Sequence, residues 1–203
     1  MSSNFAQLAF TPAVKRLQER DGSRASYARG EGARAGADPL GQDEAAFIGE
    51  RDSFYMATVG ETGWPYLQHR GGPKGFLKVL DANTVAFADF RGNRQHVSEG
   101  NLAGNERVAL ILVDYANRQR LKLLGRARVA DVSDDPALPA LLSDPAYPAK
   151  VERAIVIRVE AYDWNCPQHI TPRYSEVELG PVVEPLRARI RDLEEQLKFA
   201  SSI

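Results

Sequence analysis

The chain has 203 residues, of which 43% are hydrophobic and 26% are charged, and its formal net charge is -1. This composition is typical of one globular domain with additions, and it argues against a disordered chain. The near-neutral charge gives no overall bias toward nucleic acid or an anionic membrane surface.

The single cysteine, Cys166, excludes an internal disulfide framework, and no apolar run is long enough for a transmembrane helix. The N-terminal residues also lack the basic start and apolar block of a signal peptide. We therefore expect a cytoplasmic protein in a reducing compartment, with no membrane association.

The N-terminal region, residues 1–43, is expected to hold a helix and an arm. Thr11 is a suitable N-cap, and Pro12 a suitable first residue, for a short helix that ends near Asp21. Residues 22–41 are rich in Gly, Ala, Ser and Arg and have no hydrophobic periodicity, which predicts a surface arm. A second short helix is expected over residues 41–52.

From Ser53 onward the pattern changes to strands that are joined by short turns. Strands are predicted over residues 53–59, 64–71, 76–80, 84–90, 107–115, 119–131 and 154–164. The continuously apolar run over residues 107–115 indicates a strand that is buried on both faces. Helical segments are expected over residues 95–105 and 134–148. This order predicts a mainly β fold, an antiparallel barrel with added helices, rather than alternating βαβ units.

The C-terminal residues 176–203 are predicted to form an amphipathic helix. Leu186, Ile190, Leu193 and Leu197 recur at heptad-like spacing, and most of the residues between them are charged. Such a helix packs either on its own domain or on a partner subunit, and the pattern leaves both arrangements open.

The first segment with candidate chemistry is the turn after the strand that ends at Phe90. Gly92 can adopt a positive φ, and Asn93 is a suitable N-cap. Arg94 and Gln95 would then occupy the first turn of a helix. A helix N-terminus that carries an arginine suits a phosphate group. The alternative is a solvated turn whose arginines contact only water.

The second segment is Tyr66–Gly75. In a strand, Gln68 and Arg70 point to one side, while His69 and Gly71 point to the other. Two successive glycines would let another group approach the backbone closely. The glycine spacings of a P-loop and of a dinucleotide fingerprint are both absent. The alternative is a bulged hairpin with polar surface residues.

The third segment places three cations on one face of a strand. Arg118, Arg120 and Lys122 alternate with other residues, so they share a side of the predicted sheet. Such a basic face is either solvated or part of an anion-binding wall, and the pattern alone leaves both readings open.

The fourth segment, DWNCPQHITPRY over residues 163–174, collects scarce residue types. Cys166 and His169 are too close in sequence for a typical nucleophile and base pair, and the segment lacks zinc-ligand spacing. A buried structural cysteine is the expectation for Cys166. Two prolines stiffen this loop, which therefore suits the wall of a flat ligand. The side chains available for that wall are Trp164, Gln168, His169 and Arg173.

The order of the motifs QHRGG, FADFRGNRQ, NERVALILVDY, RLKLLGRARV and WNCPQHITPRY resembles that of the pyridoxamine 5'-phosphate oxidase-like, flavin-nucleotide-binding proteins. The resemblance covers about residues 44–174, and WNCPQHITPRY is its most specific part. It implies an antiparallel split β-barrel domain over residues 44–175 and a homodimer that holds FMN at the subunit interface. The implied activity is hydride or electron transfer through FMN, with a small-molecule substrate or NAD(P)H as the reaction partner.

The resemblance also implies which residues bind the cofactor. The strand matching the QHRGG motif lies beside the flavin ring and supplies an arginine to the phosphate, and the following turn holds the phosphate. A cation near the ring would raise the flavin potential, and a tryptophan and an arginine come from the partner subunit. The matching residues are Gln68, His69, Arg70, Gly71, Ala88, Asp89, Asn93, Arg94, Gln95, Arg120, Lys122, Trp164, Gln168, His169 and Arg173. Neither a metal nor a protein nucleophile is implied.

Two departures from the oxidases concern the substrate. Gln95 stands where the oxidases usually carry a lysine, which removes one charge from the phosphate site. The acidic, proline-rich residues 132–150 offer no clamp for a pyridoxal phosphate group beyond Lys150 and Arg153. These departures favour another small molecule, or NAD(P)H, over pyridoxamine phosphate.

Three other functions remain open from the sequence. A flavin-binding protein without turnover would carry, store or sense FMN. A haem-binding split barrel would use His69, His96 or His169 as an axial ligand. A nucleic-acid module is suggested by the arginine-rich residues 16–34, but the pI of about 6.3 and the missing basic and aromatic interleaving argue against it.

Overall fold

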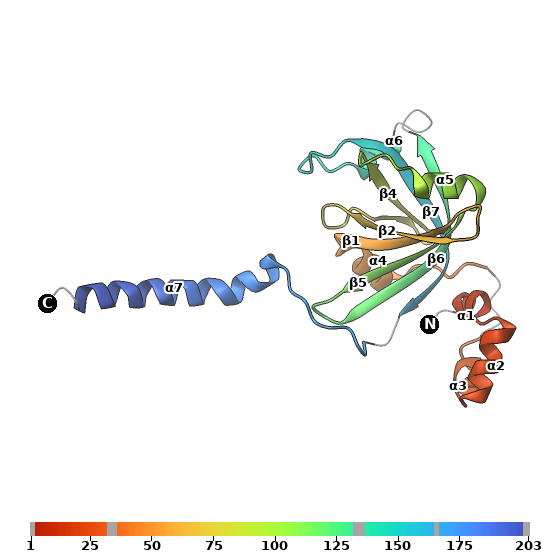
Figure 1. The fold of residues 1–203 in the computed structure, drawn as a ribbon, viewed down its shortest axis with the longest axis horizontal. Coiled ribbons are helices and arrows are strands. Elements are labelled where there is room, and N and C mark those ends of the chain that lie inside the picture. The colour runs from red at the N-terminus through yellow and green to blue at the C-terminus, as the bar shows by residue number, and fades with distance from the viewer. Residues whose placement is uncertain (1–2, 32–35, 132–136, 165–166, 201–203) are drawn as a thin grey trace.

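The structure, a computed structural model, describes residues 3–31, 36–131, 137–164 and 167–200. Its centre is a seven-stranded antiparallel sheet with the strand order β2-β1-β5-β6-β7-β4-β3 (Figure 1). The strands are β1 (Ser53–Val59), β2 (Pro65–Gly71), β3 (Lys78–Asp81), β4 (Thr84–Phe90), β5 (Arg107–Asp114), β6 (Gln119–Asp131) and β7 (Val151–Trp164). The predicted mainly β, antiparallel class with added helices is therefore confirmed.

Seven helices occur among the described residues. They are α1 (Ser3–Ala9), α2 (Pro12–Arg20), α3 (Arg24–Ala28), α4 (Gln42–Gly49), α5 (Val97–Gly104), α6 (Ala137–Leu142) and α7 (Glu176–Ala200). The predicted start of α2 is confirmed, because the Thr11 hydroxyl accepts a hydrogen bond from the backbone N–H of Val14 at 3.4 Å.

The expectation of an arm without regular structure was wrong for residues 24–28, which form α3. Glu31 lies after this helix and pairs with Arg24 at 2.6 Å and with Lys15 of α2 at 3.0 Å. Hydrogen bonds from Arg24 and Lys15 lower the pKa of Glu31 to about 2. Glu31 therefore links α2 and α3 through its ion pairs with Lys15 and Arg24.

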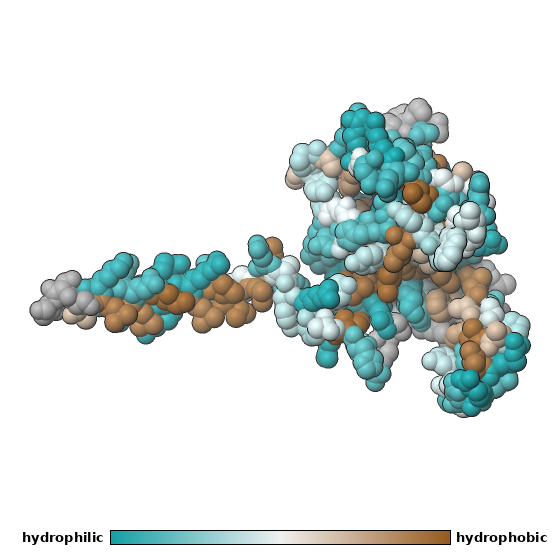
Figure 2. Space-filling view, in the orientation of Figure 1, coloured by the Kyte–Doolittle hydropathy of each residue, from teal (hydrophilic) through white to brown (hydrophobic). Residues whose placement is uncertain are grey.

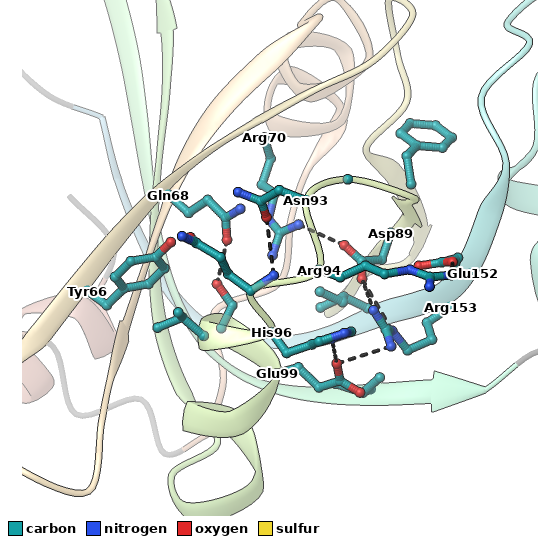
Figure 3. A pocket seen from close by; sticks show the side chains of 17 residues that line it. Tyr66, Gln68, Arg70, Asp89, Asn93, Arg94, His96, Glu99, Glu152 and Arg153 are labelled. Atoms are coloured by element: carbon teal, nitrogen blue, oxygen red, sulfur yellow. Dashed lines mark hydrogen bonds and ion pairs between the residues drawn. The ribbon is translucent and has the colours of Figure 1, made fainter.

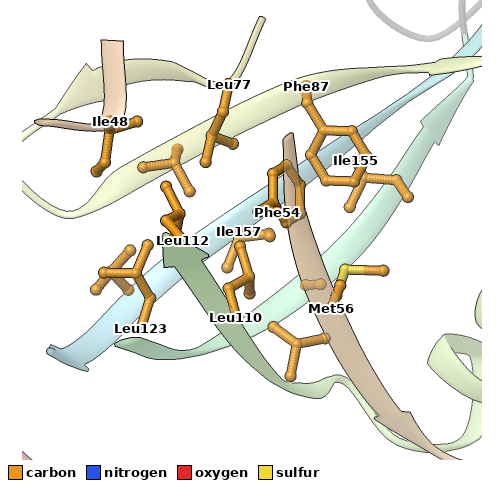
Figure 4. Packing of buried hydrophobic residues seen from close by; sticks show 14 of the residues in the cluster. Ile48, Phe54, Met56, Leu77, Phe87, Leu110, Leu112, Leu123, Ile155 and Ile157 are labelled. Carbon is orange, nitrogen blue, oxygen red and sulfur yellow. The ribbon is translucent and has the colours of Figure 1, made fainter. Parts of the chain in front are cut away.

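The hydrophobic core is packed between the strands on one side of the sheet (Figure 4). Phe54 and Met56 of β1 face Leu112 of β5, Leu123 of β6 and Ile157 of β7, and each of these side chains is at most 1% exposed. Burial of this kind contributes roughly 1.5–3 kcal/mol for each large apolar side chain. Every second residue of the central strands supplies this core, as the period of two requires.

The opposite face of β5 is only half-buried. Val108, Leu110 and Leu112 are buried, whereas Ala109, Ile111 and Val113 between them are partly exposed. The prediction that this strand is buried on both faces was therefore wrong for the single chain. Among the described residues, the elements with extensive contacts to β5 are its neighbouring strands β1 and β6.

The C-terminal helix α7 leaves the body of the molecule and projects away from it (Figure 1). Ser175 and Glu178 form a reciprocal cap at its start, with two hydrogen bonds of 2.8 Å from the backbone N–H and hydroxyl of Ser175 to the Glu178 carboxylate. None of its residues is buried, and apolar side chains follow one side of it (Figure 2). The predicted amphipathic helix is confirmed, and it does not dock on its own domain.

Among the described residues, no helix combines the length and the apolar character that a membrane span requires.

Candidate functional site

A cavity of about 80 Å³ lies where β2, β4 and the start of β7 meet the loop before α5 (Figure 3). The structure brings six of the predicted cofactor-binding residues together here. They are Gln68, Arg70, Asp89, Asn93, Arg94 and Gln95. They come from segments up to 27 residues apart in the sequence, so the local motifs converge only in the folded chain.

The side chains of β2 reach this cavity because of their register with β1. Arg70 lies opposite Phe54, and Gln68 lies opposite Met56, so both polar side chains are on the side of the sheet that carries the core. Ser98 of α5 donates a hydrogen bond to Gln68 Oε1 at 2.8 Å and thereby orients that amide. The predicted alternation along this strand is observed.

Asp89 joins two arginines at the centre of the cavity wall. Its carboxylate lies 2.7 Å from Arg70 Nη1 and 3.0 Å from Arg153 Nη2. The Arg70 guanidinium lies 5.7 Å above the ring of Phe87, and its buried Nε has no hydrogen-bond partner among the described residues. A buried donor without an acceptor costs about 1–3 kcal/mol. An oxygen of an anionic ligand that accepted a hydrogen bond from this Nε would remove that cost.

A second group of charges surrounds Glu152, on the strand beside the loop. Arg94 Nη2 lies 2.9 Å and Arg91 Nε 2.8 Å from the same oxygen of Glu152. These hydrogen bonds, from Arg94 first and Arg91 second, lower the pKa of Glu152 to about 2. Glu152 is therefore a carboxylate throughout the neutral range and occupies the guanidinium that an anionic ligand would use.

The loop before α5 differs from the predicted helix N-terminus. The helix begins at Val97, whereas Arg94 and His96 have φ angles of 59° and 56°. Such left-handed residues interrupt the helical backbone, so Arg94 and Gln95 do not form its first turn. Asn93 accepts a hydrogen bond from the backbone N–H of Gln95 at 3.2 Å and closes a turn instead of capping the helix. Positive φ angles therefore occur at Arg94 and His96, and not at Gly92, where one was expected.

Strained backbone of this kind costs about 1–3 kcal/mol for each residue and is concentrated at binding sites. In this loop the strain places Arg94, Gln95 and His96 on the cavity wall together. His96 is held by Glu99 of α5, whose carboxylate lies 2.6 Å from His96 Nδ1 and 3.1 Å from Arg153 Nη1. The loop is thus tied to both the helix and β7.

A second group of predicted residues lies on the outward face of the sheet. Arg120, His169 and Arg173 line a hollow of about 310 Å³ together with apolar side chains of β1 and β5. The Arg173 guanidinium lies 4.9 Å from the centre of the Tyr115 ring. Arg120 has a buried Nε with no hydrogen-bond partner in the part of the chain that the structure describes. The predicted set is therefore divided between two faces of one sheet.

Three of the remaining predicted residues lie along or near the same outward face. His69 contacts the Tyr55 ring with a centroid distance of 5.4 Å, and Gln68 on the other side of β2 does not share this environment. Lys122 lies 3.3 Å from Asp163 and 5.7 Å from the centre of the Phe5 ring. Gln168 is exposed in the turn after β7.

Trp164, Ala88 and Gly71 occupy structural positions in the single chain. The indole N–H of Trp164 donates to Glu44 at 2.6 Å, and its ring packs edge to face on Phe47. Ala88 is 3% exposed and packs in a small apolar cluster with Leu138 and Leu142 of α6. Gly71 is the last residue of β2.

Gly72 explains the glycine pair of this segment. A Cβ atom there would lie 2.8 Å from the Phe76 ring, so the close approach is made by a core side chain of the same domain. Cys166 lies outside the described residues, and the expectation of a structural cysteine stays a prediction.

Glu99 and Glu152 of the cavity were not recognised from the sequence, and Arg153 was considered only as a clamp for a substrate phosphate. Glu99, Glu152 and Arg153 each pair with a residue of another element. The antiparallel register places Asp89 directly opposite Arg153 on β7, across 64 positions of sequence. Opposite charges at the end of one predicted strand and the start of another were the available signal, but the pairing of those strands had first to be known.

The composition of the cavity fits a phosphate group. Three arginines, Arg70, Arg94 and Arg153, offer bidentate donors, and Gln68, Asn93 and Gln95 add amides. In the single chain these arginines are paired with the carboxylates of Asp89, Glu99 and Glu152. A ligand phosphate must therefore replace some of these carboxylates as the partner of the arginines. The volume of about 80 Å³ is far below the roughly 300–1,000 Å³ of pockets that enclose a whole cofactor. A flavin ring would therefore extend beyond this cavity.

Among the described residues, no group of three His, Cys, Asp or Glu side chains is arranged so that it could hold a metal ion.

Comparison with known proteins assigns residues 40–162 to the family described as pyridoxamine 5'-phosphate oxidase. These 123 residues are more than half of the chain. No curated protein matches the sequence.

Solved structures with a similar fold include three bacterial proteins. The HupZ protein of Group A Streptococcus has 14% identity and a TM-score of 0.48, with 66% of this chain and 99% of that chain covered. A general stress protein 26-related protein of Clostridium acetobutylicum has 16% identity and a TM-score of 0.44, with 64% and 88% covered. An FMN-binding protein of Syntrophomonas wolfei has 13% identity and a TM-score of 0.46, with 60% and 83% covered.

Proposed function

Because the chain belongs to the pyridoxamine 5'-phosphate oxidase family, whose fold is the split β-barrel, we propose that it binds FMN and transfers hydride or electrons through it. The proposed assembly is a homodimer with FMN at the subunit interface. The proposed reaction partner is a small molecule, with NAD(P)H as a candidate electron donor.

The cavity beside the strained loop carries this proposal. Arg70 and Arg94 approach it from two different segments, and the buried Nε of Arg70 has no hydrogen-bond partner among the described residues. An FMN phosphate is a dianion at neutral pH, and paired guanidinium groups recognise phosphate through bidentate, charge-assisted hydrogen bonds. We assign the phosphate to this cavity, with Arg70, Arg94 and the amide of Gln95 as its principal contacts.

The outward face of the sheet supports the dimeric form of the proposal. Tyr55, Ile111 and Val113 are apolar, at least partly exposed and grouped around the hollow that holds Arg120. A second copy that covered this face would bury those side chains and enclose a ring too large for the phosphate cavity. In the proposed dimer, Arg173 reaches the flavin of the other subunit, whereas Trp164 stays packed on Phe47 on the core side of the sheet.

When bound, FMN supplies the redox chemistry, and the protein supplies position and electrostatics. A reduced flavin carries negative charge, which a nearby cation stabilises. Arg120 is the best-placed candidate because its guanidinium is partly buried on the proposed interface and its Nε has no hydrogen-bond partner among the described residues. Lys122 is a weaker candidate, since its ammonium is already paired with Asp163.

Pyridoxamine phosphate is not the substrate that we propose. Arg153, one of the two basic residues available for a substrate phosphate, is paired with both Asp89 and Glu99. Lys150 borders a neighbouring, more open hollow beside Arg94. A second phosphate group would have to compete for charges that the cofactor site already uses.

The test is an absorption spectrum of the purified protein with and without added FMN, followed by anaerobic NADPH. We expect flavin bands that remain with the protein after gel filtration and bleach when NADPH is added. A bound flavin that NADPH does not bleach would support a carrier or another electron donor, and a Soret band would support the haem-binding alternative. Protein that takes up neither cofactor would contradict the proposal.

A further inference from the structure

The exposed apolar residues on one side of α7 follow a regular heptad pattern. Positions a hold Val183, Ile190 and Leu197, and positions d hold Leu179, Leu186, Leu193 and Ala200. The pattern continues for three heptads without an interruption, which is the length at which a coiled coil becomes a specific expectation. The two prolines within the helix, Pro181 and Pro185, occupy positions f and c, away from this side.

This apolar side has no cover within the described chain. Leu186 is 60% exposed, Ile190 is 55% exposed and Leu193 is 42% exposed. The helix projects from the body with the apolar residues along one edge (Figure 2). A continuous stripe of large apolar side chains in water favours association with a complementary surface.

From these features we propose that α7 pairs with α7 of a second copy of this chain to form a parallel, two-stranded coiled coil. β-Branched residues at the first two positions a, together with Leu at three positions d, favour a parallel dimer over higher oligomers. Both surfaces come from the same sequence, so the contact is isologous and closes at two copies.

Charge complementarity supports the second copy as the occupant. In a parallel coil, Arg189 at position g faces Glu194 at the following position e of the partner helix, and symmetry creates this pair twice. In the single chain Arg189 contacts Asp192 of its own helix at 2.7 Å, an exposed pair that is weak and easily exchanged. Position e of the preceding heptad holds Arg187, which faces Val182 and meets no like charge at position g.

The test uses the full chain with Cys166→Ser, so that an added cysteine is the only thiol. Leu186→Cys and Leu193→Cys place a thiol at two positions d, and Ala188→Cys places one at position f. Under mild oxidation at low protein concentration, we expect both position d variants to form disulfide-linked dimers. Their dimer yield should exceed that of the position f control by about tenfold, because only positions a and d face each other across the seam.

Two outcomes of this experiment would overturn the proposal. Crosslinking at Leu193 without crosslinking at Leu186 would show an antiparallel or shifted pair, because only parallel helices align every position with itself. Absence of crosslinking at both positions, or equal crosslinking at Ala188, would mean that another surface covers α7.

A charge exchange gives a second measurement that does not depend on disulfide geometry. In the Leu193→Cys background, Arg189→Glu and Glu194→Arg should each lower the crosslinked fraction about threefold, since each creates two like-charge contacts. The double variant should restore it. Arg191→Glu, at position b, should leave it unchanged, and failure of the double variant to recover would contradict the parallel register.

Discussion

Arg94 is the residue on which the proposed phosphate site depends most directly. We expect Arg94→Ala to weaken FMN binding by about 1.5–3 kcal/mol, the range for a hydrogen bond to a charged group. Titration of the protein with FMN, followed by quenching of flavin fluorescence, measures the change. Arg128→Ala is the matched control, because Arg128 is an exposed arginine of β6 that borders a different hollow. Equal affinities in the two variants would remove Arg94 from the site.

Glu152 is the opposing residue, because it holds Arg94 in the absence of ligand. We expect Glu152→Gln to tighten FMN binding by a few-fold, since it removes a carboxylate that competes with the phosphate. The lowered pKa of about 2 means that the carboxylate stays charged on acidification to pH 5, so only the substitution relieves this competition. Glu160 lies on the same strand as Glu152 but pairs with Arg126 of β6. Glu160→Gln should therefore leave FMN affinity unchanged.

A riboflavin titration distinguishes the cause of the Glu152 effect. Riboflavin lacks the phosphate, so its affinity should not respond to Glu152→Gln if the carboxylate competes only with that group. Tighter binding of both ligands would point instead to a general loosening of the loop.

At the level of elements, the packing of β6 on β7 depends on a glycine that sequence analysis gave no role. A Cβ atom at Gly125 would lie 2.6 Å from the carbonyl oxygen of Arg158 and 2.9 Å from Ile157. The position coincides with the register shift between Leu124 and Gly125, where the strand must accommodate its neighbour closely. The glycine therefore permits the longest strand pair of the sheet.

We expect Gly125→Ala to destabilise the fold by about 1–3 kcal/mol, as overpacking typically does. Gly100→Ala is the control: a Cβ atom at Gly100 meets nothing within 4 Å, and alanine in a helix interior gains up to about 1 kcal/mol. Urea unfolding of both variants measures the difference. A Gly125→Ala variant as stable as the parent would show that β7 shifts without cost.

At the level of the whole molecule, the proposed FMN site and the proposed dimer must stabilise each other. If the flavin contacts both subunits, FMN affinity should fall when the protein is diluted below its dimer dissociation constant, and added FMN should shift the protein toward dimer. Sedimentation velocity with and without FMN, across a hundredfold range of protein concentration, measures both effects. An unchanged dimer population at saturating FMN would place the flavin within one subunit.

The two proposed contacts between copies are separable in such experiments. The outward face around Tyr55 and Ile111 belongs to the sheet, whereas the heptad side of α7 lies outside the body of the molecule. A substitution at Leu193 should change crosslinking through the helix and leave the flavin phosphate contacts intact, because no residue of α7 lines the cavity.

The sequence by itself determined the features that depend on local order. Alternation along residues 65–71 predicted which side of β2 carries Gln68 and Arg70, and Thr11 with Pro12 predicted the start of α2. The heptad spacing predicted an amphipathic C-terminal helix, and the order of motifs predicted the family that the match over residues 40–162 confirms. Strand alternation, helix capping and heptad spacing each involve residues at most seven positions apart, and the order of motifs is read directly along the chain, so the sequence is sufficient to define them.

Only the tertiary structure decided which charges meet. Asp89 and Arg153 are brought opposite each other by the pairing of β4 with β7, and Glu152 reaches Arg94 through the same pairing. The turn that was predicted to begin a helix at Arg94 is held in a left-handed conformation beside those partners. Strand pairing joins residues that are far apart in the chain, and no local pattern specifies the register that places them together.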